Sequence, residues 1–86
     1  MKSVLLKVKT GEGIFSNEYE VSFKDSNGRS LSIFIDKTEV IKNGKDTVVS
    51  VNSIDNQDET YNILLPSETL ETFTRWVDIP KTEILM

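Results

Sequence analysis

The sequence contains neither cysteine nor histidine among its 86 residues. Without cysteine, disulfides and thiolate metal sites are excluded, and a reducing compartment is favoured. Without histidine, the chain also lacks the commonest general base and the commonest transition-metal ligand. Only carboxylate chemistry remains for catalysis. We therefore expect a protein that is not an enzyme and that holds no cofactor or metal.

Long hydrophobic runs are absent as well. The apolar residues near the N-terminus are soon interrupted by Lys7 and Lys9, which argues against a signal peptide. No segment approaches the length of a membrane span. A chain of 86 residues fits one domain, and folding would bury roughly 64% of the unfolded surface. We expect a single cytoplasmic domain, residues 1–86, without membrane partners.

The charge is negative overall and unevenly distributed. Residues 1–45 carry eight Lys/Arg against six Asp/Glu, whereas residues 46–86 carry two against eight, a net charge of −6. Nucleic-acid binding depends on clustered cations, so no nucleic-acid partner is expected. The acidic second half indicates either solvated loops or an acidic surface that docks on a basic site.

Alternation of apolar and polar residues, which is typical of strands, dominates the chain. It predicts strands over residues 2–10, 18–25, 29–36, 47–54 and 60–66. In the first of these, Val4, Leu6 and Val8 share one face, and a glycine pair at Gly11 and Gly13 ends the pattern. Residues 36–45 are expected to form an irregular or short-strand connection, and residues 81–86 a turn or terminal extension after Pro80.

Face alternation also selects the registers of two hairpins, because cross-strand partners must share a face. A three-residue loop at residues 26–28 pairs Phe23 with Leu31 and places Gly28 where a bulged hairpin needs a left-handed residue. The same reasoning predicts Val21 opposite Ile33. Further pairs expected on this basis are Tyr19 with Ile35, Val51 with Ile63, Val49 with Leu65 and Ser53 with Tyr61.

Residues 67–76 fit two descriptions. Leu70, Phe73 and Val77 have the spacing of a helix face, but the threonines in this stretch favour a loop followed by a strand over residues 72–79, with Phe73 and Val77 on one face. We therefore predict an all-β fold: a small antiparallel meander barrel of five or six strands, SH3-like or OB-like. The alternative is an α+β fold with a short helix at 67–76.

Two polar features suggest chemistry only weakly. Glu18 and Asp36 lie opposite each other in the first hairpin and could act as a carboxylate pair. Solvent-facing neighbours near a strand end explain them better. The acidic run at residues 55–59 lacks the spacing of a calcium loop and is better explained as a polar hairpin tip.

Aromatic residues outside the predicted core are the main candidates for binding. Phe15, beside Ile14, follows the glycine pair and either plugs the open end of the barrel, which we favour, or anchors a partner. Trp76 and Phe34 are expected to point outward, with Arg75 beside the tryptophan; they either bind a partner or cover the second face of the sheet.

These observations predict a non-enzymatic protein-interaction module that presents Phe15, Phe34, Arg75 and Trp76 to a protein partner. The alternative is an acidic inhibitor that occupies a basic site on another protein. A small-ligand binder or a carboxylate-based enzyme using Glu18 and Asp36 is a weaker possibility. The oligomeric state stays open, because unpaired edge strands can also associate.

Overall fold

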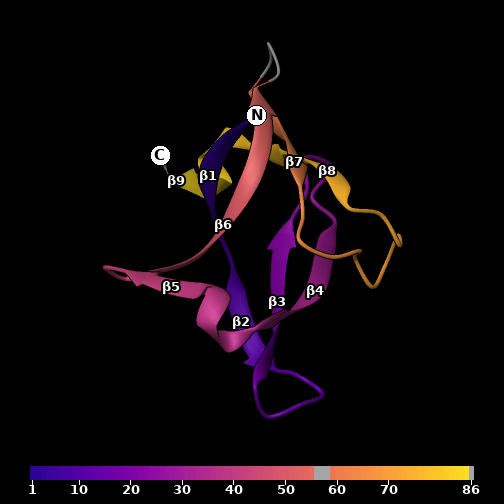
Figure 1. Cartoon of the computed structure of the whole chain (residues 1–86). Helices are drawn as coiled ribbons and strands as arrows, with labels where there is room; N and C mark the ends of the chain where they lie inside the picture. Colours follow the sequence, from indigo (N-terminus) through magenta and orange to yellow (C-terminus); the bar gives the residue numbers. More distant parts are fainter. Residues whose placement is uncertain (56–58, 86) are drawn as a thin grey trace.

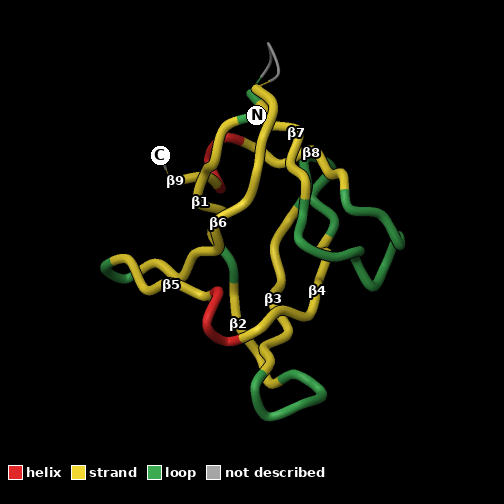
Figure 2. Tube along the Cα trace, in the orientation of Figure 1, coloured by secondary structure: helices red, strands yellow, loops and turns green. Residues whose placement is uncertain are grey.

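The computed structural model describes residues 1–55 and 59–85, and these form nine strands and two short 3₁₀ helices (Figures 1 and 2). The prediction of an all-β fold is confirmed. The alternative helix at 67–76 is wrong, since residues 66–75 form a loop and Trp76 opens a strand. No helix among the described residues is long and apolar enough to cross a membrane.

The strands form two antiparallel sheets. Their bounds are β1 Lys2–Lys7, β2 Lys9–Glu12, β3 Glu18–Lys24, β4 Ser30–Asp36, β5 Val40–Asn43, β6 Asp46–Asp55, β7 Thr60–Leu64, β8 Trp76–Pro80 and β9 Ile84–Leu85. The helices are η1 Lys37–Glu39 and η2 Lys81–Glu83. One sheet has the order β8-β7-β6-β1-β9, with β5 also paired to β6, and the other is β2-β3-β4. The strands therefore do not close into the predicted barrel; the SH3-like or OB-like assignment stays a prediction.

The two sheets are connected by a break in the first predicted strand. Residues 2–10 were expected to form one strand, but β1 pairs with β6 and β9, whereas β2 pairs with β3. Between them, the Val8 N–H donates to the Thr47 carbonyl at 2.9 Å. Val8 remains buried, together with Val4 and Leu6, so the predicted apolar face is kept while the chain changes sheets. β2 also runs on to Glu12, past the predicted break at Gly11.

The first hairpin has the predicted register. Phe23 lies opposite Leu31 and Val21 opposite Ile33. Gly28 has φ = +77° and donates its N–H to the Asp25 carbonyl at 3.0 Å, so a residue without Cβ occupies the left-handed position. The remaining predicted pair, Tyr19 with Ile35, is also present.

The second hairpin has the predicted faces but not the predicted register. Ser53 pairs with Ile63, not with Tyr61, because β6 extends to Asp55 and pairs that residue with Tyr61. The shift is two residues, which leaves every side chain on its expected face. The connection at residues 36–45 contains η1 and then β5, which pairs back on β6.

One hydrophobic core lies between the two sheets. Apolar residues from both sheets bury themselves there, and Val21, Ile63, Leu65 and Ile79 have no measurable exposure. Other members are Val4, Leu6, Val8, Phe23, Leu31, Ile33, Ile35, Val49, Val51, Tyr61, Val77 and Ile84. β9 also contributes to the core, since Ile84 is buried and pairs with Leu6, so residues 81–85 form a short helix and a strand where a turn or terminal extension was predicted.

Candidate functional site

The loop of residues 66–75 connects β7 to β8 and lies along β4 of the other sheet (Figure 2). At its base, the Leu65 N–H donates to the Arg75 carbonyl at 2.8 Å. Further along, the Leu70 N–H donates to the Ser32 carbonyl at 2.9 Å, and the Ser67 hydroxyl donates to the Phe34 carbonyl at 3.3 Å. The loop is thus tied to both sheets.

A carboxylate fixes the loop on β4. Oε1 of Glu71 accepts the Ser32 N–H at 2.8 Å, and Oε2 accepts the Ser32 hydroxyl at 2.6 Å. Burial raises the pKa of Glu71, but the two hydrogen bonds from Ser32 lower it, and the net pKa lies below its ordinary value of 4.5. Glu71 is therefore ionised at neutral pH and acts as a double acceptor.

Threonine side chains shape the turn that follows. Thr69 is buried, and its N–H donates to the Thr74 carbonyl at 2.9 Å. Its hydroxyl accepts the Thr72 N–H at 3.0 Å and contacts the Thr72 hydroxyl, which in turn contacts that of Thr74. The Phe73 N–H donates to the Thr69 carbonyl at 3.0 Å. These bonds define one conformation of the turn without using a large side chain.

Phe73 combines two unfavourable properties. Its φ is +56°, and it is the one residue other than glycine with positive φ in the part of the chain that the structure describes. For a bulky residue, the left-handed region costs roughly 1–2 kcal/mol. Its side chain is also 72% exposed to solvent. An aromatic residue this exposed gains little from burial in the fold, and strained residues gather at functional sites.

Trp76 and its neighbours extend this exposed surface. Trp76 begins β8 opposite Leu64, on the face away from the core, and is 44% exposed. A cavity of about 270 Å³ beside it separates the loop from the turn of the first hairpin and is lined by Asn27 and Thr74, among others. Arg75 is exposed, and its Nε donates to the Leu65 carbonyl at 3.0 Å.

We call the exposed residues Leu70, Phe73, Arg75 and Trp76 the 70–76 surface. All four belong to one seven-residue segment at the end of the loop and the start of β8. Two of them, Arg75 and Trp76, are residues that the sequence predicted for partner binding. The other two were missed, because helical spacing grouped Leu70 and Phe73 with Val77 and the strand predicted over 72–79 again placed Phe73 on the face of Val77.

The other two predicted site residues do not join this surface. Phe15 is 64% exposed in the loop after β2, at the bottom of Figure 1, whereas the 66–75 loop lies on the right. The favoured plug prediction is wrong, since Ile14 is exposed too. The physical reason is a tight closure. The Gly13 N–H donates to the Glu18 carbonyl and the Glu18 N–H to the Phe15 carbonyl, which directs the tip outward.

Phe34 is half-buried on β4, opposite Glu20. The cavity beside Trp76 is lined by Arg29, which directly precedes β4, and Phe34 lies five residues or about 16 Å further along the chain. Phe34 does not line that cavity, and its carbonyl accepts the Ser67 hydroxyl of the 66–75 loop.

The carboxylate pair has a structural task. Glu18 and Asp36 are opposite in register as predicted. Asp36 accepts the N–H of Thr38 at 2.9 Å and its hydroxyl at 2.8 Å, capping η1, and these bonds lower the pKa of Asp36. A cavity of about 190 Å³ lined by Tyr19, Lys37 and Val40, among others, includes neither carboxylate.

Metal ligands do not gather in the described part of the chain. No group of three or more Asp or Glu side chains is placed there to hold an ion. The acidic run at residues 55–59, weighed above as a calcium loop, lies largely outside the described residues.

No protein-family model, curated protein or solved structure matches this chain.

Proposed function

We propose that the protein is a non-enzymatic interaction module that docks on a protein partner through the 70–76 surface. The observation that carries this proposal is Phe73, which is strained and 72% exposed on a loop fixed by hydrogen bonds. A fold without a partner at this position would be more stable with a polar residue that tolerates positive φ. Burial of the ring in a complex supplies the compensating free energy.

The composition of the surface supports the same conclusion. Aromatic residues and arginine dominate binding hot spots, and Phe73, Arg75 and Trp76 lie within four positions of one another. The bonds from Thr69 and Glu71 hold the loop in place before binding, which reduces the entropy lost on association.

The partner that fits this surface has an apolar cleft with a basic rim. Glu68, Glu71 and Asp78 flank the aromatic residues along the chain, against two cations, Arg75 and the Arg29 that lines the cavity beside Trp76. This excess of carboxylates continues the acidic character of residues 46–86. Opposite charge on the partner would speed association without supplying most of the affinity. We also propose a cytoplasmic location, which the lack of cysteine supports.

A matched pair of variants tests the proposal. Tagged wild-type, Phe73→Asn and Phe15→Asn proteins are used as baits in the same lysate of the source organism, with washes at low and high salt. Phe15 is a suitable control because it is nearly as exposed but lies on a different loop. We expect a partner that wild-type and Phe15→Asn retain at high salt and that Phe73→Asn loses.

The captured partner is then titrated in purified form against the protein. Trp76 is the single tryptophan, so its fluorescence should shift to the blue when the surface is buried. Equal retention by all three baits would contradict the proposal. A partner that wild-type and Phe73→Asn baits capture equally at low salt and lose at high salt would instead support the acidic-inhibitor alternative.

A further inference from the structure

We infer that the gap between β1 and β3 is a second binding site, which takes a small organic anion with an apolar body. The gap opens where the chain leaves one sheet for the other at Val8. Its volume is about 390 Å³, within the size range of small-ligand pockets. The 70–76 surface contributes no residue to it. The inference is thus independent of the proposed function.

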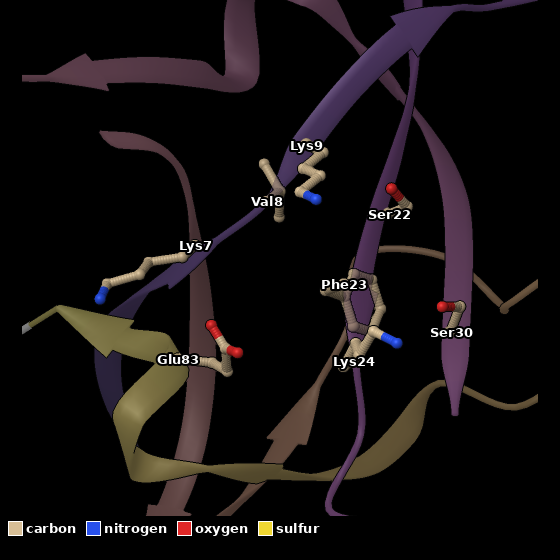
Figure 3. Close-up of a pocket in the computed structure, with 8 residues that line it drawn as sticks. All are labelled: Lys7, Val8, Lys9, Ser22, Phe23, Lys24, Ser30 and Glu83. Atoms are coloured by element: carbon tan, nitrogen blue, oxygen red, sulfur yellow. The ribbon is translucent and has the colours of Figure 1, made fainter. Parts of the chain in front are cut away.

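Three lysines from adjoining strands surround this gap. Lys7 ends β1, Lys9 begins β2 and Lys24 ends β3 (Figure 3). Glu83 is the one acidic residue of the lining, so the lining carries a net charge of +2 in a chain of −4. This positive site in an acidic protein favours an anion with one or two charges, and the acidic surroundings disfavour a long polyanion.

The ammonium groups differ in how they are engaged. Lys7 donates to the Thr82 carbonyl at 3.3 Å, which ties η2 to one side of the gap. Neither Lys9 nor Lys24 forms an ion pair or a side-chain hydrogen bond with any residue that the structure describes. These two groups are free to receive an anion, and charge-assisted hydrogen bonds are the stronger kind.

The main chain adds a further donor. Asp25 donates its N–H to the Arg29 carbonyl, and Ser32 directs its N–H and carbonyl to the 66–75 loop. In an antiparallel pair of strands, residues whose peptide groups bond to the partner strand alternate with residues whose peptide groups point away from it. Asp25 bonds across to Arg29, so the peptide groups of the preceding residue, Lys24, point away from β4. On that side β2 begins only at Lys9, opposite Ser22, so no strand covers them. The Lys24 N–H therefore faces the gap.

The other residues that line the gap indicate the chemistry of the rest of the ligand. Val8 and Phe23 are almost fully buried and form an apolar floor. Ser22 and Ser30 add hydroxyl groups beside the lysines (Figure 3). An anion held by Lys9 and Lys24 would place an attached apolar group on this floor. A carboxylate or phosphate ester of a compact ring has this chemistry.

The test uses phenyl phosphate as the probe, followed by ¹⁵N-edited NMR at low ionic strength. Inorganic phosphate tests the head group without the ring, benzoate replaces the phosphate by a carboxylate, and benzyl alcohol tests the ring without charge. We expect saturable binding of phenyl phosphate with shifts at the amides of Lys9, Ser22 and Lys24. Benzoate should bind at the same place, and benzyl alcohol should not.

Two double variants decide whether the lysines form a site. Replacing Lys9 and Lys24 by Gln should weaken binding roughly tenfold or more, the effect of losing charge-assisted hydrogen bonds. Replacing Lys42 and Lys45 by Gln removes the same charge from the exposed β5–β6 hairpin and should leave binding unchanged. All four side chains are exposed, so both variants should fold, and their NMR spectra would verify this.

Three results would overturn the inference. Equal weakening by both double variants would mean general attraction of anions to lysine. Equal binding of benzyl alcohol would mean an apolar pocket with no role for charge. Tighter binding of a thymidine oligonucleotide than of phenyl phosphate at the same amides would assign the gap to single-stranded nucleic acid.

Discussion

Replacing Phe73 by Asn should leave the fold as stable as the wild type or make it more stable. Asn tolerates the left-handed region, so the substitution removes part of a backbone cost of roughly 1–2 kcal/mol. The ring is 72% exposed, so its loss removes little burial. Scaling a fully buried Phe at about 1.5–3 kcal/mol gives a loss of only about 0.4–0.8 kcal/mol. The net change lies between about zero and +1 kcal/mol.

The matched control is Phe15→Asn. Phe15 is 64% exposed and has no positive φ, so Asn there should lose about 0.5–1 kcal/mol with nothing regained. The difference between the two variants isolates the backbone strain at Phe73. For a domain of this size, about 1 kcal/mol corresponds to roughly 4–8 °C in Tm.

The assay is thermal and urea unfolding followed by circular dichroism, with the same baseline for all three proteins. Phe73→Asn should unfold at the wild-type midpoint or above it, and Phe15→Asn below it. A loss of more than about 1 kcal/mol in Phe73→Asn would mean that the ring packs in the fold, and the strain argument would fail.

Three further substitutions follow from the structure. The folded pKa of Glu71 is depressed, so its contribution to stability is present above the ordinary value of 4.5 and lost as pH falls through the folded pKa. Glu71→Gln should therefore flatten the dependence of stability on pH in that window, measured by urea unfolding. An unchanged profile would mean that the bonds between Glu71 and Ser32 do not stabilise the fold. Asp25 is buried and accepts the N–H groups of Asn27 and Arg29, so Asp25→Ala should cost about 1–3 kcal/mol, and a neutral result would show that the turn forms without it. Leu65 is fully buried, so Leu65→Ala should cost about 2–5 kcal/mol in the same assay, and less than 1 kcal/mol would place it outside the core.

Within the regular strands, local rules were enough to predict which side chains face the core. Alternation assigned Val21, Ile33 and Ile63 inward, and all three are buried, because a strand places successive side chains on opposite faces. The length of the loop at residues 26–28 was enough to predict the register of the first hairpin. It did not fix that of the second, because a shift of two residues changes no face and only the length of β6 distinguishes the alternatives.

Other features depend on contacts between distant segments. Nothing in the residues around Val8 indicates that the chain changes sheets there; the Thr47 carbonyl that receives its N–H is far along the sequence. The loop of the candidate site is a similar case. Phe73 has an ordinary apolar spacing, and its exposure follows from a turn fixed by threonine hydroxyls and by Glu71 on Ser32. Arg75 and Trp76 were predicted because tryptophan and arginine are the residue types that dominate binding hot spots.

The hydrogen bonds between Ser32 and Glu71 also protect the edge of β4 from pairing with another copy of the protein. An outer strand such as β4 offers unpaired N–H and carbonyl groups on which a strand of another molecule can be added. In this chain the Ser32 N–H donates to the Glu71 carboxylate and the Ser32 carbonyl accepts the Leu70 N–H, so the middle of β4 has no free main-chain group at this residue for a further strand. A fixed negative charge at that position also repels an approaching copy. Acid conditions that protonate Glu71 would therefore weaken this protection of the β4 edge, while the bond from Leu70 to Ser32 remains.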